Sequence, residues 1–425
     1  MLEPRILKGT RDHGPLTMAK RDYIMRQIVE IFQNYGYDTI ETPVIEYAEM
    51  ILGKYGDEGD KLTYHFQDNG DRHIALRYDQ TVPFARYFAM NHNDLPKPFK
   101  RYQISRVWRA DKPQRGRLRE FYQCDIDIIG TDSLLAELEC VLVINDVLTK
   151  LGFADFEIQF NDRRTLTAVL ESVEVSSDQT VTVIRILDKL DKIGIEAVKR
   201  ELQDIGLAED QIQQLESLLL QPASNSEKLE RLKNYKVEAV SEIFAQAEAA
   251  GVDLKRLNFN PALARGLDYY TGIIFEVVLL EDRSLGTICA GGRYANLCGM
   301  FCNDQFSGVG VAFGFERLVE ALQSRELLTG IGLASQVLIV NFGSKLDSAN
   351  LQLATTLRAA GINTEYYFED AKLAKQFKYA DKKQIPYVAV QGEDEQKRGV
   401  VVLKNMQTGE QQELNAKQLV AKFAE

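Results

Sequence analysis

The clearest pattern in the chain is a pair of segments in which apolar and polar residues alternate. Residues 98–109 and 119–129 both have the two-residue period of a strand, and the segment between them, ADKPQRGRL, contains the turn residues Pro113 and Gly116. This pattern predicts a β-hairpin. Because successive side chains of a strand point to opposite faces, Gln123, Asp125 and Asp127 share one face of the second strand, and Tyr122, Cys124, Ile126 and Ile128 share the other.

Helical and strand-like periods divide the rest of the chain. Residues 18–34 have apolar positions at helical spacing and precede the strand-like segment YDTIETPVIEY. Residues from about 165 to 250 have the pattern of successive amphipathic helices, after which strand patterns return at GIIFEVVLL and GVGVAFGF. From residue 336 onward, strand and helix patterns alternate, which predicts a small α/β unit with its own core.

These patterns predict an α+β fold in several parts. We expect a first domain over residues 1–325 with a helical insertion at about 165–255, a linker over 326–335, and an α/β domain over 336–425. A chain of 425 residues is long enough for about two or three domains. The last of these regions has 12 Lys or Arg against 11 Asp or Glu, so it is the least acidic part of the chain.

Composition narrows the possible functions. The formal charge of −11 argues against nucleic-acid binding by bulk electrostatics, so a polyanion must meet a local basic patch. We find no apolar run of membrane-spanning length and no secretory signal in MLEPRILKGTRDHGP, so we expect a cytoplasmic protein without a membrane partner. The chain has five cysteines without CxxC pairs and four histidines without zinc-site spacing, so we expect reduced thiols and no protein-bound metal. Cys298 and Cys302 are four residues apart and could bind a metal ion only with further ligands.

A basic patch is expected at the tip of the predicted hairpin. The arginines there, which would repel one another, are Arg106, Arg109, Arg115, Arg117 and Arg119. Such crowding favours a site for a multiply charged anion. The acids of the second strand could simply form a solvated polar face. If they instead belong to the same site as the arginines, the two groups favour a ligand with an ammonium at one end and phosphates at the other.

The segment GVGVAFGFERLVEAL carries another candidate arginine. Its glycines have the spacing GxGxxxG without the acid of a dinucleotide fingerprint, and the chain has no P-loop. Arg317 lies in the first turn of the helix predicted after Gly314, where its charge opposes the helix dipole unless an anion binds there. The alternative is a surface ion pair with Glu316 or Glu320.

Three further segments contain candidate site residues. ALARGLDYYTGIIFE and CAGGRYANL place aromatic side chains near glycines, which let a flat ligand approach the backbone but also suit the end of a hairpin. LRYDQTVPFARY, with Asp79 and Thr81, is by itself no more than a turn.

Together and in this order, these segments resemble the histidyl-tRNA synthetases over nearly the whole chain. The first class II motif is resembled by residues 18–34 with ETPVIEY, the second by FKRYQISRVWRAD and RGRLREFYQCDIDIIG, and the third by AFGFERL. Two segments peculiar to this family are resembled by RGLDYYTG and AGGRY. The tail resembles the anticodon-binding domain shared by the histidyl, threonyl, prolyl and glycyl enzymes. The resemblance implies a class II antiparallel sheet flanked by helices, a homodimer, and formation of histidyl-adenylate from L-histidine and ATP with Mg²⁺, followed by transfer to tRNA(His).

The resemblance also implies roles for individual residues. For ATP these are Arg109, Asp111, Arg117, Arg265 and Arg317, of which Arg109, Arg265 and Arg317 would be catalytic. For histidine they are Asp127 and Tyr270 at the imidazole, Asp79, Thr81 and Gln123 at the α-ammonium, and Tyr269 with a Gly291–Gly292 turn closing the pocket. One form of the family has Glu where Asp79 and Asp127 stand, so we expect this pocket to close by about one methylene's length. Asp111 likewise stands where Glu is common, which puts its adenine contact in doubt.

For tRNA, the implied residues lie at the hairpin tip and in the tail. They are Gln114 and Arg115, which would meet the acceptor end, and Lys372, Lys375 and Lys378, which recur at near-helical spacing and would follow the anticodon arm unless they form a solvated face. Three other functions are to be weighed. One is a regulatory paralogue of ATP phosphoribosyltransferase, which typically lacks such a tail and loses catalytic arginines. The others are a prolyl or threonyl enzyme, of which the threonyl enzyme would need a zinc site, and a tRNA-binding scaffold.

Overall fold

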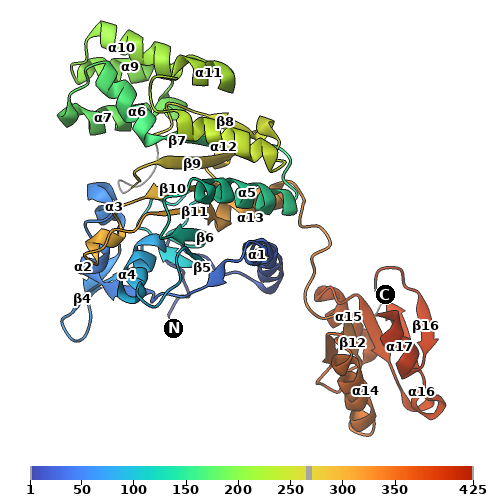
Figure 1. Cartoon of the computed structure of the whole chain (residues 1–425). Coiled ribbons are helices and arrows are strands. Elements are labelled where there is room, and N and C mark those ends of the chain that lie inside the picture. The colour runs from blue at the N-terminus through green and yellow to red at the C-terminus, as the bar shows by residue number, and fades with distance from the viewer. Residues whose placement is uncertain (1, 265–269, 424–425) are drawn as a thin grey trace. The chain divides into compact units, whose positions relative to one another are not determined.

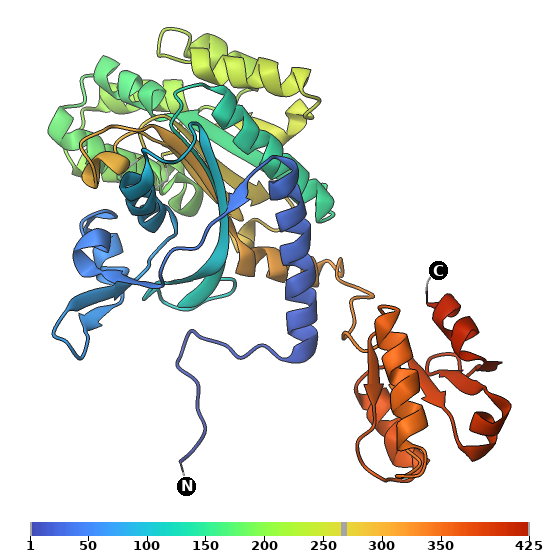
Figure 2. The same ribbon diagram turned by 60° about the horizontal axis from the view of Figure 1, so that its bottom comes forward.

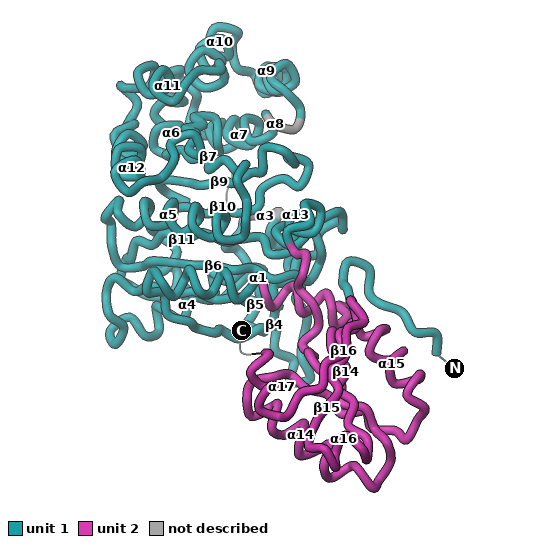
Figure 3. The backbone as a smooth tube through the Cα atoms, turned by 90° about the vertical axis from the view of Figure 1, so that its right-hand side faces the viewer, with its two compact units in different colours: residues 1–12, 24–327 teal, residues 13–23, 328–425 magenta. Residues whose placement is uncertain are grey.

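The computed structural model describes residues 2–264 and 270–423, which form two compact units (Figure 3). Unit 1 consists of residues 1–12 and 24–327, and unit 2 of residues 13–23 and 328–425. The change of unit after Leu327 falls at the start of the predicted linker, whereas the grouping of residues 13–23 with the tail has no counterpart among the predicted boundaries.

Unit 1 is built on an eight-stranded sheet with the order β1-β5-β6-β11-β10-β9-β7-β8 (Figure 1). Its strands are β1 (Asp38–Thr39), β5 (Phe99–Trp108), β6 (Glu120–Ile129), β7 (Phe156–Asp162), β8 (Leu257–Phe259), β9 (Ile273–Leu279), β10 (Cys289–Tyr294) and β11 (Gly308–Gly314). Neighbours are antiparallel except at the two edges, where β1 runs parallel to β5 and β8 to β7. The predicted hairpin is therefore confirmed as β5 and β6.

Helices cover one face of this sheet. They include α1 (Pro15–Asn34), α5 (Leu135–Lys150), α12 (Glu238–Ala249) and α13 (Phe315–Ser324). The ring of Phe32 at the end of α1 lies 5.7 Å from the ring of Tyr102 on β5 and 6.0 Å from that of Phe313 on β11. Cys124 and Ile126 of β6 are fully buried on this side. The apolar face predicted for the second hairpin strand is thus the core face of the sheet.

A second layer lies on the opposite face. It contains α4 (Thr81–Asn91), the short helices α2 (Ala48–Ile51) and α3 (Gly56–Leu62), and a small sheet of order β2-β4-β3 made by β2 (Ile45–Tyr47), β3 (His65–Gln67) and β4 (His73–Leu76). Phe84 of α4 stacks on Phe99 at 6.2 Å and lies 4.6 Å from the guanidinium of Arg101. The polar face of β6 is therefore covered by protein.

The helical insertion lies beyond one edge of the sheet. Figures 1 and 2 show its helices gathered at the end of the sheet where Figure 1 labels β7 and β8. They are α6 (Arg163–Ser172), α7 (Ser177–Leu187), α8 (Leu190–Ile193), α9 (Ile195–Asp204), α10 (Glu209–Leu215), the π-helix η1 (Glu216–Leu220) and α11 (Asn225–Arg231). Short 3₁₀ turns occur at η2 (Leu254–Arg256), η3 (Arg283–Leu285) and η4 (Cys298–Met300). Val183, Val198 and Ile212 show the buried stripe that their amphipathic pattern predicts.

Unit 2 is the expected α/β unit. Its sheet has the order β13-β12-β14-β15-β16, with the first three strands parallel and the last two antiparallel. The elements are β12 (Val337–Ile339), α14 (Asp347–Ala359), β13 (Thr364–Tyr366), α15 (Leu373–Lys382), β14 (Tyr387–Val390), α16 (Glu393–Arg398), β15 (Val401–Asn405), β16 (Gln411–Leu414) and α17 (Ala416–Lys422). Across the described residues, no helix combines the length and apolarity that crossing a bilayer requires.

Candidate functional site

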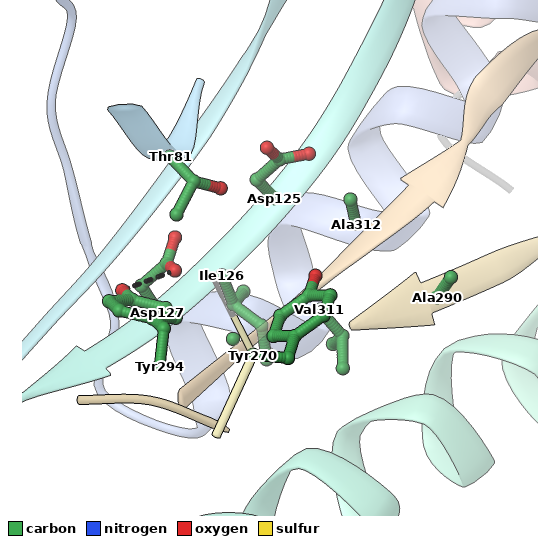
Figure 4. A pocket seen from close by; sticks show the side chains of 10 residues that line it. Thr81, Asp125, Ile126, Asp127, Tyr270, Ala290, Tyr294, Val311 and Ala312 are labelled. Atoms are coloured by element: carbon green, nitrogen blue, oxygen red, sulfur yellow. Dashed lines mark hydrogen bonds between the residues drawn. The ribbon is translucent and has the colours of Figure 1, made fainter. Parts of the chain in front are cut away.

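The polar face of β6 forms the floor of a small cavity in unit 1 (Figure 4). Its lining includes Thr81, Asp125, Asp127, Tyr270, Ala290, Tyr294, Gly310 and Ala312. The strand register places Gly310 beside Asp127 and Ala312 beside Asp125, so the neighbouring strand adds little or no side chain to the floor. Asp125 and Asp127 are each only 2% exposed, so the alternative of a solvated polar face was wrong, because the second layer covers it.

Asp127 is held by protein contacts on both oxygens. Its Oδ1 accepts a hydrogen bond of 2.7 Å from the Tyr294 hydroxyl, and its Oδ2 lies 2.5 Å from Nη2 of Arg101, which is fully buried. Burial raises the pKa of Asp127 to about 6, although Arg101 and the Tyr294 hydroxyl favour the charged form. At neutral pH this carboxylate is therefore an ionised acceptor with a fixed orientation.

Glycines make this arrangement possible. A Cβ on Gly310 would lie 2.2 Å from Oδ1 of Asp127, and a Cβ on Gly291 would lie 2.0 Å from the Gly310 carbonyl oxygen. A Cβ on Gly292 would lie 2.7 Å from the Ile273 carbonyl oxygen. The predicted turn at Gly291 and Gly292 was wrong, because both residues lie within β10, where the lack of side chains permits close packing against adjacent strands.

Asp79 and Thr81 lie at the start of α4. Oδ1 of Asp79 accepts hydrogen bonds from the Tyr55 hydroxyl at 2.8 Å and from the backbone N–H of Val82 at 3.0 Å. Asp79 is 3% exposed, and the Thr81 side chain lines the cavity. The Asp79 carboxylate thus joins the first turn of α4 to the Tyr55 side chain.

Arg109 directly follows β5 and lies beside Gln123. Its Nε donates to the Tyr78 carbonyl at 3.0 Å and its Nη2 to Oε1 of Gln123 at 3.5 Å, while the guanidinium lies 4.3 Å from the centre of the Tyr78 ring. These contacts fix the plane of the guanidinium next to the polar row of β6.

The other arginines of the hairpin find partners in the protein. Arg106 pairs with Glu120 at 3.1 Å, Arg115 with Glu320 at 2.9 Å and Arg117 with Asp111 at 3.4 Å, and Arg119 donates to the carbonyls of Asp111 and Lys8 at 3.2 Å each. Acids of the chain itself therefore offset the repulsion expected from the crowding. The clustering alone does not require an anion.

Arg317 meets the hairpin tip. It lies in the first turn of α13, as predicted, and donates to the Thr287 carbonyl. A Cβ on Gly116 would lie 3.1 Å from Cγ of Arg317, and Gly116 has a φ of +66°, which favours glycine. Arg115 at the same tip pairs with Glu320 further along α13. The second and third motif-like segments are therefore in contact.

The remaining predicted site residues are distributed over both units. Tyr270 lines the cavity, whereas Arg265 and Tyr269 lie outside the described residues. Gln114 is exposed at the hairpin tip, where its backbone bonds to Arg117.

The predicted lysines belong to unit 2. Lys372 directly precedes α15, and Lys375 and Lys378 lie on its exposed side. Lys375 pairs with Glu369 at 3.0 Å. Phe368, just before this helix, is 92% exposed and was not predicted as a site residue.

Sequence reasoning also missed Arg101, Tyr294 and Tyr55, which position the predicted acids. Arg101 lies directly opposite Asp127 in the β5–β6 register. The sequence could therefore have revealed this pair, because the position of the hairpin turn determines which residues of the two strands face each other. Tyr294 ends the AGGRY segment but reaches Asp127 only through the pairing of β10, β11 and β6.

Metal ligands do not gather in the described part of the chain, which contains no group of three or more His, Cys, Asp or Glu side chains that could hold an ion. The five cysteines are free thiols, and four of them are buried. The spacing of Cys298 and Cys302 therefore gains no further ligand there.

Comparison with known proteins identifies the family. A family model described as Histidyl-tRNA synthetase matches residues 9–318, and one described as Anticodon binding domain matches residues 336–425. The chain belongs to the histidyl-tRNA synthetase family. It is therefore an aminoacyl-tRNA synthetase, a ligase that uses ATP as a substrate.

Relatives of this synthetase match along its whole length. It is 43% identical to the histidine–tRNA ligase of Phocaeicola vulgatus, with 99% of this chain and 98% of the relative covered. The crystal structure of histidyl-tRNA synthetase from Nostoc sp. PCC 7120 is 32% identical, has a TM-score of 0.89, and matches over 100% of this chain and 99% of that one. A Bacillus halodurans protein described as an ATP phosphoribosyltransferase regulatory subunit/histidyl-tRNA synthetase shares the fold at 22% identity and a TM-score of 0.77, covering 92% of this chain and 100% of that one. The match of the tail to the anticodon-binding model favours the synthetase over the regulatory alternative. The family match and the full-length match to a histidine–tRNA ligase exclude the prolyl and threonyl alternatives and favour the synthetase over a scaffold.

Proposed function

We propose that unit 1 of this histidine–tRNA ligase forms histidyl-adenylate on the polar face of β6 and that the histidyl group is then transferred to the 3′ end of tRNA(His), with AMP as the leaving group. The observation that carries the proposal is that Arg109 lies against Gln123, at the end of the row that holds the buried acids of β6, while Arg317 from a distant segment lies against the tip of the same hairpin. It supports a site with a phosphate-binding end and an amino-acid end.

At the phosphate end, arginines neutralise charge during an in-line displacement. A carboxylate oxygen of histidine attacks the α-phosphorus of ATP, and the bond to the β-phosphate oxygen breaks to release pyrophosphate. Arg109 is placed to hold the reacting carboxylate and α-phosphate, because Tyr78 and Gln123 fix its guanidinium. By resemblance, Arg117, Arg317 and Asp111 hold the outer phosphates and adenine, and Arg265 completes the catalytic set with Arg109 and Arg317.

Mg²⁺ would enter with ATP and share the charge of the leaving pyrophosphate. This cation prefers oxygen ligands and is commonly bound through substrate phosphates and one or two carboxylates. Because the described residues offer no cluster of three potential ligands, the phosphates would supply most of its coordination.

At the amino-acid end, buried polar groups select the imidazole. Asp127 is an ionised acceptor held by Arg101 and Tyr294, and Tyr270 lines the same cavity. Asp79, Thr81 and Gln123 are assigned to the α-ammonium, while Tyr269, Gly291 and Gly292 complete the pocket by resemblance. A ligand without the matching donor or acceptor would leave these buried groups unpaired, which opposes its binding.

Recognition of tRNA would use both units. Gln114 and Arg115 at the hairpin tip are assigned to the acceptor end, and Lys372, Lys375 and Lys378 to the phosphates of the anticodon arm. Phe368 exposes an aromatic face beside these lysines, where an unpaired base can stack. A homodimer and action in the cytoplasm complete the proposal.

The test is ATP–pyrophosphate exchange with each of the twenty amino acids. We expect histidine alone to support exchange and Arg109→Ala to slow it by roughly 10²-fold or more, since a positioned charge at the reacting centre is lost. Arg106→Ala is the matched control, because Arg106 is on the same hairpin but pairs with Glu120 outside the cavity. Exchange with another amino acid, or an equal loss in both variants, would refute the assignment.

A further inference from the structure

Asp125 is a buried carboxylate that the reaction described above does not use. It lies between Gln123 and Asp127 on the cavity face of β6. It is 2% exposed, and neither of its carboxylate oxygens has a hydrogen-bond partner in the part of the chain that the structure describes. Burying a carboxylate without partners is costly, so this side chain is suited to meet a cationic donor.

The side chain borders the cavity. Figure 4 shows Asp125 and Asp127 on the same strand, with Thr81 across from them. The neighbour of Asp125 on β11 is Ala312, so the adjacent strand presents only a methyl group at this position. A ligand in the cavity can therefore approach the Asp125 carboxylate.

The other acids of the site already have protein partners. Asp127 is matched by the charge of Arg101 and the hydroxyl of Tyr294. Asp79 binds the Tyr55 hydroxyl and the first turn of α4. Neither arrangement includes the Asp125 carboxylate.

The order of side chains along β6 indicates which part of the ligand Asp125 meets. Gln123 contacts Arg109, which is assigned to the histidine carboxylate and the α-phosphate, and Asp127 is assigned to the imidazole. In an amino acid the α-carbon lies between the carboxylate and the side chain, and it carries the ammonium group. Asp125 is the middle residue of this row, and Thr81 faces it from α4.

We propose that Asp125 binds the α-ammonium group of histidine, together with Thr81. The inference rests on the proposed function and deepens it by naming the acid that compensates this charge. Asp79 then orients the start of α4 and contributes to the ammonium site at longer range.

Protonation offers a second readout. Burial raises the pKa of Asp125 well above its ordinary value. The charged groups that act on it are Arg101, Asp127, Asp79 and Arg109, of which the two arginines favour ionisation and the two acids oppose it. Binding of an ammonium favours the ionised form, so any proton that this carboxyl holds in the free protein would be released when histidine binds.

The first experiment compares ligands that differ by one group. Wild-type protein and Asp125→Asn would be titrated calorimetrically with histidine, with histidinol, which lacks the carboxylate, and with 3-(imidazol-4-yl)propionate, which lacks the ammonium. We expect Asp125→Asn to weaken binding of histidine and histidinol by at least about tenfold, as for a lost charge-assisted hydrogen bond, and to leave imidazolylpropionate binding unchanged. Equal weakening for all three ligands, or no weakening, would overturn the proposal.

Two further measurements separate it from a structural role. The thermal midpoint of Asp125→Asn should equal or exceed that of wild type, because the substitution removes a buried carboxylate without partners; a marked fall would indicate a structural group. In buffers of different ionisation enthalpy at pH 8, where free imidazole is neutral, any proton release that wild type shows with histidine beyond that with imidazolylpropionate should be absent from Asp125→Asn. Release that persists in the variant would contradict the proposal. Failure of wild type to bind histidine at all would instead refute the proposed function.

Discussion

The Asp127–Arg101 pair shows how single residues tune this site. Arg101 is fully buried and faces both the Asp127 carboxylate and the Phe84 ring. Burial outweighs the attraction of the guanidinium, so the pKa of Asp127 rises to about 6 rather than falling. The carboxylate is therefore ionised at neutral pH at a cost to the stability of the folded protein.

This cost predicts a pH-dependent difference between wild type and Asp127→Asn. The pKa of Asp127 is higher in the folded protein than the ordinary value of 3.8, so the folded state binds the proton more tightly and stability falls as pH rises between these values. From pH 5 to pH 7, wild type should lose about 1.4 kcal/mol more unfolding free energy than Asp127→Asn. Denaturation followed by the fluorescence of Trp108, the single tryptophan and a residue of β5 in unit 1, measures the difference.

Asp94→Asn provides the control for this measurement, because Asp94 is exposed on the same unit. It should follow the wild-type pH profile. Parallel profiles for wild type and Asp127→Asn would show that Asp127 titrates as an ordinary exposed acid.

The residues of the site differ in how far sequence could reveal them. Asp127 and Thr81 were assigned from local segments, and both line the cavity. Tyr294 could not be assigned, because its contact with Asp127 depends on the pairing of strands that are distant in sequence. The burial of Asp125 was equally hidden, since alternation gives the face of a strand but not what covers that face.

At the scale of elements, the β5–β6 hairpin and α13 meet at a single close contact. The elements themselves were predictable from their periods, but the sheet order that brings β11 beside β6 is set by non-local pairing. Arg317 emerges in the first turn of α13 directly after β11, and Gly116 at the hairpin tip lies against its side chain. The position of Arg317, which we assign to the ATP phosphates, therefore depends on the conformation of the hairpin.

This contact predicts that Gly116→Ala impairs use of ATP. The new methyl would press on Arg317 and would also strain a backbone with a φ of +66°. We expect a several-fold higher KM for ATP in pyrophosphate exchange, with an unchanged affinity for histidine in calorimetry.

Gly36→Ala is the matched control, because Gly36 has a φ of +74° and no atom within 4 Å of the added Cβ. It carries the same kind of backbone strain without touching an arginine. A similar KM for ATP in both variants would assign the effect to strain alone.

At the scale of the whole molecule, the chemistry and the binding of the anticodon arm are assigned to separate units. The cavity and the hairpin belong to unit 1, and the lysines of α15 belong to unit 2. The tail has a charge balance close to zero within a chain of net charge −11, so the proposed attraction of the anticodon arm rests on local lysines and not on overall charge. The two steps of the reaction should therefore respond differently to changes in unit 2.

The combined variant Lys372→Ala, Lys375→Ala and Lys378→Ala tests this separation. Pyrophosphate exchange should remain at the wild-type rate, while the KM for tRNA(His) in aminoacylation rises. A plot of the logarithm of tRNA affinity against the logarithm of salt concentration should also become shallower by roughly two units of slope, because each lost phosphate contact removes about 0.7–0.9. Lys397→Ala is the control, since Lys397 is an exposed lysine of α16 in the same unit. An unchanged salt slope would mean that the three lysines form only a solvated face, and a parallel loss of exchange would show that unit 2 also supports the chemistry of unit 1.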